Sequence, residues 1–176
     1  NKNKIKKLRI GKSSGDLLTK NYSIVDNKQE LSFLFNKKKY NLKTKLIGKI
    51  QIKNLLMSIL AASNSNIKLN KILKSVENIK AVPGRLEKVG NLKNNSIAIL
   101  DYAHTPDALE TCILNIKEHF KHRKINLVFG CGGDRDKSKR SIMGRIANNL
   151  CDKIYLTDDN PRTESPKKIR NNIKAK

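Results

Sequence analysis

The sequence predicts an α/β fold whose C-terminal half is a parallel β-sheet covered by helices. From residue 96 onward, short apolar runs alternate three times with helical stretches, and the connecting loops are short. This alternation is typical of parallel strands joined by crossover helices. Before that point, apolar alternations separated by turn residues predict a β-meander, and two helices follow it.

The N-terminal half begins with a Lys-rich stretch, residues 1–47, that contains three expected strands. The strands are expected at residues 23–25, 31–35 and 40–42, and the turns between them at residues 26–28 and 36–38. Gly48 ends this region. Residues 50–62 then carry apolar side chains almost all round a helix, which predicts that the helix is buried. Asn54 lies inside that helix, so its amide needs a partner, either backbone or a ligand.

A second helix is expected over residues 67–79, because apolar residues recur there at helical spacing. Val82-Pro83-Gly84 then predicts a hinge or a domain boundary. The expected strands of the C-terminal half are residues 96–100, 125–129 and 154–156, and the expected helices are 106–120, 139–150 and 166–176. Thr105 is the expected N-cap of the first of these helices and Pro106 its first residue. Ile142, Ile146 and Leu150 predict the buried face of the second.

Each of the three C-terminal strands is followed by a polar cluster, at residues 101–104, 130–136 and 158–162. In parallel sheets, ligands bind beyond the carboxyl ends of the strands. We therefore expect Asp101 and Asp159 at the ends of neighbouring parallel strands, with Gly130 on a third. Three such clusters at one sheet edge indicate a binding site.

The residue types in two clusters suit a molecule with both an amine and a carboxylate. Asp159 and Asn160 can accept from an ammonium group, and Arg162 can bind a carboxylate through two parallel hydrogen bonds. Arg135, in the glycine-rich loop, is a second candidate for a carboxylate. That loop has neither the GxxxxGK[ST] nor the GxGxxG motif. The alternatives are an ordinary surface turn for the first cluster and an Asp–Arg network for the second.

Composition leaves a second class of function open. The net charge is +23, which would suit an anionic partner such as nucleic acid. However, the lysines are spread along the whole chain, which is what an AT-rich genome would produce, and aromatics are only 5%. Three widely spaced cysteines predict reduced thiols and a cytoplasmic protein. No apolar stretch reaches about 18 residues, so no membrane span is expected.

Four motifs occur in an order that resembles the Mur ligases of peptidoglycan synthesis, especially the members that add meso-diaminopimelate. They are Gly84-Arg85-Leu86-Glu87, the run from Asp101 to Leu109, the run from Phe129 to Lys137, and Asp159-Asn160-Pro161-Arg162. The resemblance covers roughly residues 20–176 and is most specific from 84 to 162. It implies that residues 1–87 end a central ATP-binding domain. Residues 88–176 would be the first half of a Rossmann-like, amino-acid-binding C-terminal domain.

The resemblance also implies a reaction. ATP phosphorylates the D-glutamate carboxylate of a UDP-muramoyl dipeptide, and the amine of meso-diaminopimelate attacks the acyl phosphate. ATP and Mg²⁺ would be the cofactors, with the magnesium ligands, the phosphate loop and the UDP-binding domain upstream of this chain. The chain does not begin with Met and is expected to be a fragment that is inactive alone. No metal ligand is expected within it. The parent protein is expected to be a monomer that binds neither nucleic acid nor membrane.

Residue roles follow from the same resemblance. Asn54 matches the asparagine at the adenine, Arg85 the catalytic arginine at the terminal phosphates, Asp101 the aspartate at the ribose, and His104 lies beside the nucleotide. The expected diaminopimelate contacts are Arg135, Asp159, Asn160, Pro161 and Arg162. Gln51 departs from the family's usual asparagine and would weaken the adenine contact. The lysine-adding relatives are the nearer alternative, and a basic nucleic-acid-binding module is the more distant one.

Overall fold

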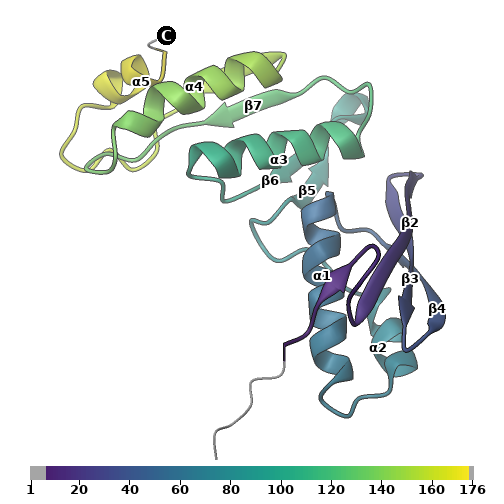
Figure 1. The fold of residues 1–176 in the computed structure, drawn as a ribbon. Helices are drawn as coiled ribbons and strands as arrows, with labels where there is room; N and C mark the ends of the chain where they lie inside the picture. The colour runs from purple at the N-terminus through teal and green to yellow at the C-terminus, as the bar shows by residue number, and fades with distance from the viewer. Residues whose placement is uncertain (1–6, 175–176) are drawn as a thin grey trace, which may run out of the picture. The chain divides into compact units, whose positions relative to one another are not determined.

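The computed structural model describes residues 7–174, and the chain divides into two compact units, Asn1–Leu100 and Asp101–Lys176 (Figure 1). Each unit has its own cluster of buried apolar side chains. The last two residues of the helix expected over 166–176 lie outside the described residues. The functional boundary expected between residues 87 and 88 stays a prediction.

The first unit contains the predicted β-meander. Its sheet has the order β1 (Ile10–Gly11), β2 (Leu17–Val25), β3 (Lys28–Phe35) and β4 (Lys38–Thr44). β2, β3 and β4 pair antiparallel, and the short β1 runs parallel to β2. Both hairpin turns have two residues with positive φ, at Asp26-Asn27 and Asn36-Lys37. Asn and Asp tolerate this backbone, so the turns form where these residues predicted them.

Helices α1 (Lys49–Ser63) and α2 (Leu69–Val76) share one core with the meander. The prediction that α1 is buried all round is wrong. Leu55, Leu56 and Ile59 are buried, but Met57 is 55% exposed and Asn54 is exposed. Only the face of α1 that packs with the meander is covered. The amide of Asn54 therefore lies at the surface, where it needs no buried partner.

Strand β6 (Ile97–Leu100) forms as predicted, but its pairing differs from the expectation. In the described ladders β6 pairs antiparallel with β5 (Glu87–Asn91), and the two are joined through the short 3₁₀ helix η1 (Lys93–Asn95). A connection this short can only return the chain antiparallel. β5 was not predicted, because its residues are mostly polar and show no clear alternation.

The second unit contains α3 (Pro106–His119), β7 (Asn126–Phe129), α4 (Ser138–Leu150), β8 (Lys153–Leu156) and α5 (Pro166–Lys174). β7 and β8 pair parallel, with Phe129 opposite Leu156, which confirms the parallel arrangement for these two strands. The predicted cap is also confirmed: Thr105 Oγ1 accepts from the Ala108 amide at 3.3 Å, and Pro106 is the first helical residue.

The buried face of α4 differs from the predicted one. Ile142 is 38% exposed, whereas Arg140, Met143 and Ala147 are buried. Helix α5 packs closely against this face. A Cβ atom on Gly144 would lie 1.9 Å from the carbonyl oxygen of Ile173, so only glycine permits this contact. A buried arginine on α4 is the feature that the apolar pattern did not reveal.

Candidate functional site

Two loops leave the carboxyl ends of β7 and β8 and lie against each other. The glycine loop, residues 130–137, follows β7, and the proline loop, residues 157–165, follows β8. The Gly133 amide donates to the Asn160 carbonyl at 2.9 Å, and the Thr157 amide donates to the Phe129 carbonyl at 3.0 Å. The parallel register of the strands thus continues into a paired loop structure.

The glycines of the first loop make this pairing possible. A Cβ atom would lie 2.4 Å from the Thr157 carbonyl oxygen if placed on Gly130, and 1.8 Å from that of Pro161 if placed on Gly133. On Gly132 it would lie 2.9 Å from Nη1 of Arg162. The sequence predicted close approach of a ligand or a neighbouring domain. Within the second unit, the proline loop approaches instead, through its backbone at Gly130 and Gly133 and through the Arg162 side chain at Gly132.

Three predicted side chains are exposed on the proline loop, whose backbone is tightly fixed. Asp159 Oδ1 accepts from the Asn160 amide at 2.7 Å, and Asn160 Oδ1 accepts from the Arg162 amide at 3.3 Å. Arg162 has a φ of 51°, a left-handed conformation that is uncommon outside glycine. Its Nη1 donates to the Gly133 carbonyl at 2.7 Å, whereas Nη2 has no hydrogen bond to any described residue. Pro161 is half-buried in the same turn.

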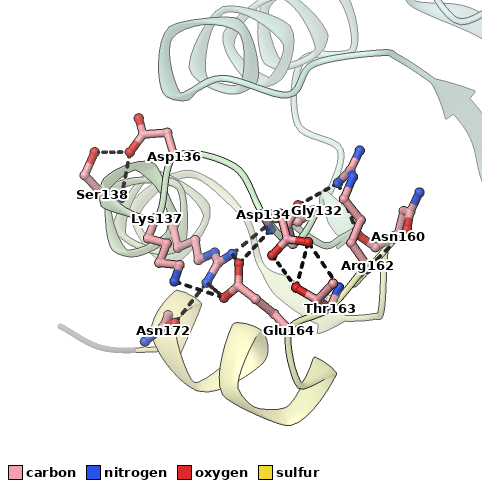
Figure 2. A network of polar contacts seen from close by, with 12 residues as sticks. Gly132, Asp134, Asp136, Lys137, Ser138, Asn160, Arg162, Thr163, Glu164 and Asn172 are labelled. Carbon is pink, nitrogen blue, oxygen red and sulfur yellow. Dashed lines mark hydrogen bonds and ion pairs between the residues drawn. The ribbon is translucent and has the colours of Figure 1, made fainter.

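Arg135 is exposed and makes no ion pair with the aspartates beside it among residues 7–174. Asp134 instead accepts from the amide and the hydroxyl of Thr163 (Figure 2), and these bonds lower the pKa of its carboxyl. Asp136 accepts from the amide and hydroxyl of Ser138 at the start of α4, which lowers its pKa as well. The Asp–Arg network that was the alternative for this loop is therefore not formed among the described residues, and Arg135 remains available to a ligand.

A buried ion pair, which sequence reasoning missed, joins α4 to the proline loop. Arg140 has no exposed surface, and its Nη2 donates to Glu164 Oε1 at 2.8 Å and to the Gly132 carbonyl at 3.2 Å. Its Nη1 donates to Glu164 Oε2 at 3.0 Å and to Asn172 Oδ1 at 3.1 Å. Figure 2 shows Glu164 between the glycine loop and α5. Hydrogen bonds from Arg140, and then from the Asp134 amide, lower the pKa of Glu164 to about 2.

The nucleotide-side candidates of the second unit lie just after β6. Asp101 is half-buried, and the side chain of His104 is exposed with Nδ1 3.1 Å from the Tyr102 carbonyl. Lys139 Nζ donates to the His104 carbonyl at 2.7 Å. This bond ties the segment that carries Asp101 and His104 to the start of α4, directly after the glycine loop.

The other two nucleotide-side candidates belong to the first unit. Asn54 and Arg85 are both exposed. The side-chain amide of Gln51 donates to the Arg85 carbonyl at 2.6 Å. Gln51 thus links α1 to the turn that carries Arg85. Gln51, Asn54 and Arg85 thus come from one region of the first unit. A nucleotide site that also includes Asp101 and His104 stays a prediction.

Other features of the described residues bear on the predicted ligands. Residues 7–174 hold no group of three or more His, Cys, Asp or Glu side chains that could bind a metal ion. None of their helices is long and apolar enough to cross a membrane. A groove of about 560 Å³ lies along α1 and β1, but its lining contains none of the candidate residues. Burial raises the pKa of the Cys131 thiol, which fits a packing role.

Comparison with known proteins identifies the family. Residues 84–176 match the family model described as "Mur ligase, glutamate ligase domain". The chain belongs to the Mur ligase family. Among its curated relatives, the UDP-N-acetylmuramoyl-L-alanyl-D-glutamate–2,6-diaminopimelate ligase of Rickettsia montanensis is 42% identical over 170 residues. That alignment covers 96% of this chain but 34% of the relative, so the chain spans about a third of the length of the protein it matches.

Solved Mur ligases have the same fold over nearly the whole chain. A structure of a UDP-N-acetylmuramoyl-L-alanyl-D-glutamate–2,6-diaminopimelate ligase superposes with a TM-score of 0.65 at 28% identity, covering 95% of this chain and 34% of that one. The UDP-N-acetylmuramate–alanine ligase of Thermotoga maritima gives a TM-score of 0.74 at 25% identity, covering 95% and 37% respectively. Both comparisons confirm the predicted α/β fold class.

Proposed function

We propose that this chain supplies part of the ATP site and part of the amino-acid pocket of a ligase that adds meso-diaminopimelate to UDP-N-acetylmuramoyl-L-alanyl-D-glutamate. The observation that supports this most is the pair of locked loops with exposed Arg135, Asp159 and Arg162. Their backbone is fixed by hydrogen bonds between the loops, while Arg135, Asp159 and Arg162 themselves are exposed. Such preorganisation lowers the entropy lost on binding.

The residue types fit meso-diaminopimelate better than a simple amino acid. This substrate carries two amino-acid ends. Nη1 of Arg162 donates to the Gly133 carbonyl, whereas Nη2 has no hydrogen-bond partner among the described residues. Nη2 can therefore still donate to a carboxylate. Asp159 and Asn160 can accept from the ammonium group at the same end. Arg135 offers a second guanidinium on the neighbouring loop.

The proposed reaction follows the family. The γ-phosphoryl group of ATP passes to the D-glutamate carboxylate, the substrate amine attacks the acyl phosphate, and ADP and phosphate leave. Catalysis of this kind depends on positioning and on neutralising negative charge. Exposed Arg85 suits the terminal phosphates, Asn54 the adenine and Asp101 the ribose hydroxyls, and His104 would lie beside the nucleotide. No described cluster suits Mg²⁺, so its ligands would come from other parts of the enzyme.

A lysine-adding ligase is the second candidate within the family. L-Lysine has an ammonium group but no carboxylate at its distal end. With lysine as substrate, the arginine of this pocket would have no carboxylate to bind, so one charge-assisted hydrogen bond would be lost. The residues of the proline loop favour diaminopimelate on this ground. Cytoplasmic location and a monomeric state remain expectations.

The test is a complete ligase in which this chain replaces the matching third of the Rickettsia montanensis relative. Phosphate release and peptide product are measured with the UDP-muramoyl dipeptide, ATP and either meso-diaminopimelate or L-lysine. We expect turnover with meso-diaminopimelate and at least about tenfold lower kcat/KM with lysine, the effect of losing one charge-assisted contact. Equal use of both amino acids, or of neither, would contradict the proposal.

A further inference from the structure

We propose that Arg140 and Glu164 are positioning residues that set the spacing of Arg135 and Arg162 across the amino-acid pocket. The inference rests on the proposed function, which places the incoming amino acid on the glycine and proline loops. Neither residue is among the predicted ligand contacts. Arg140 lies on α4 and Glu164 belongs to the proline loop, and the contacts of the pair reach both loops.

Arg140 joins three segments of the second unit. From α4 it donates to the Gly132 carbonyl of the glycine loop, to both oxygens of Glu164 in the proline loop, and to Asn172 on α5. The arginine is fully buried. A planar guanidinium holds such partners at fixed angles, whereas a lysine in its place would offer a single flexible ammonium group.

An acidic side chain of each loop also accepts hydrogen bonds from the other loop. Glu164 of the proline loop accepts from the Asp134 amide of the glycine loop at 2.7 Å. In return, Asp134 accepts from the Thr163 amide at 3.1 Å and from its hydroxyl at 2.8 Å. Each loop thus binds the backbone of the other through an acidic side chain, as the dashed lines in Figure 2 show. We call Arg140, Glu164, Asp134 and Thr163 the loop clamp.

The loop clamp lies directly beside the proposed ligand contacts. Arg135 follows Asp134 in the chain, and Arg162 precedes Thr163. We therefore expect a change in the clamp to move one arginine relative to the other. The clamp also occupies one carboxylate of each loop, because Glu164 is paired with Arg140 and Asp134 is bonded to Thr163. These acids then do not compete with the substrate carboxylate for Arg135 and Arg162.

The test compares Glu164→Gln with Arg170→Gln. The first substitution keeps the shape of the side chain but removes its charge. The second removes a different ion pair, between Arg170 on α5 and Asp158 in the proline loop. That pair does not include the glycine loop. Kinetics are measured in the complete ligase that carries this chain. Amide hydrogen exchange and melting temperature are measured on the 176-residue chain itself.

For Glu164→Gln we expect the KM for meso-diaminopimelate to rise about tenfold or more, while kcat and the KM for ATP stay within about threefold. Amide exchange at Asp134 should become at least about tenfold faster, because its amide then faces a neutral amide oxygen in place of the Glu164 carboxylate. Exchange at Thr163 should rise with it, because Asp134, the acceptor of the Thr163 amide, is held less firmly. Arg170→Gln should change none of these values. Thr163→Val, which keeps the ion pair, should give a smaller rise in the same KM.

Three outcomes would count against the proposal. If Glu164→Gln leaves the KM for meso-diaminopimelate unchanged in an active ligase, the positioning role is wrong. If it lowers kcat and raises every KM together with a fall in melting temperature, the pair supports only the fold. If amide hydrogen exchange in the two loops is unchanged in Glu164→Gln, the loop clamp itself is wrong. A complete ligase that carries this chain without substitutions and does not use meso-diaminopimelate would instead contradict the proposed function.

Discussion

A Cβ atom on Gly133 would lie 1.8 Å from the carbonyl oxygen of Pro161. No real side chain tolerates such a distance, so the glycine loop and the proline loop can meet only because residue 133 has none. The contact is buried, and the Gly133 amide donates to Asn160 beside it. The geometry of the candidate pocket therefore depends on backbone packing as well as on its charged side chains.

Gly133→Ala should destabilise the second unit and separate the loops. Overpacking of this kind costs about 1–3 kcal/mol. Gly90→Ala is the matched control, because nothing lies within 4 Å of a Cβ placed there, and it should change stability by less than about 0.5 kcal/mol. Urea denaturation of the 176-residue chain measures both. Equal stability of the two variants would mean that the loops can part without cost.

Gly144→Ala tests the packing of α4 against α5. In an isolated helix, replacing glycine by alanine stabilises by about 1 kcal/mol. Here the added Cβ would lie 1.9 Å from the Ile173 carbonyl oxygen, and a clash with backbone cannot be relieved by a rotamer change. We expect net destabilisation, by about 1–3 kcal/mol. A rise in the melting temperature would show that the two helices are not packed as described.

The stability of the second unit should depend on pH through Glu164. Hydrogen bonds from Arg140 and the Asp134 amide lower the pKa of this carboxyl to about 2, from an ordinary value of 4.5. The unfolded state then binds more protons between these values, so the contribution of Glu164 is complete above pH 4.5 and is lost as pH falls toward 2.

The check is the melting temperature of the wild type and of Glu164→Gln as a function of pH. Asp134 and Asp136, whose pKa values are also lowered, titrate in both proteins, so the difference between the curves reports Glu164. That difference should be constant above about pH 5 and should shrink below 4.5. A constant difference down to the lowest pH at which the chain folds would exclude the depressed pKa.

The chain alone should neither hydrolyse ATP nor ligate amino acids. Residues 7–174 contain no metal-binding cluster, and the sequence has no GxxxxGK[ST] phosphate loop. Contacts from Asn54, Arg85 and Asp101 do not replace a phosphate loop and its magnesium ion, which neutralise most of the charge in phosphoryl transfer. Magnesium-dependent release of phosphate by the purified chain, above a sample treated with EDTA, would contradict this account.

The features predicted correctly from the sequence have local causes. Asn27 and Asn36 lie in hairpin turns because asparagine tolerates positive φ, and Thr105-Pro106 begins a helix because of its capping chemistry. The polar clusters after β7 and β8 were found because strand and loop follow each other in the chain. The contacts of Arg162 with Gly133, however, depend on how the two loops meet.

The features that were missed depend on contacts between distant residues. Arg140 and Glu164 are 24 residues apart, and nothing near either one indicates an ion pair. On a helical pattern, Arg140 reads as a solvent-exposed residue and Ile142 as a buried one, but the structure has the reverse order of exposure. Strand β5 forms because β6 offers it a partner, although its own residues have little strand propensity.

Recognition of the amino acid by the proline loop is the main element of the proposed function. It is tested most directly by Arg162→Lys in the complete ligase that carries this chain. In the wild type, Nη1 of Arg162 is held by the Gly133 carbonyl, and Nη2 is left to donate to a carboxylate. Lysine has one ammonium group for both partners. Because a charge-assisted hydrogen bond is worth about 1.5–3 kcal/mol, the KM for meso-diaminopimelate should rise about tenfold or more.

The decisive measurement is steady-state kinetics with meso-diaminopimelate and ATP varied separately. We expect the KM for meso-diaminopimelate to rise while the KM for ATP stays within about threefold, because Asp159 to Arg162 belong to the amino-acid pocket. Equal losses for both substrates would mean that Arg162 supports the fold or a conformational step, and they would contradict the recognition role of the proline loop.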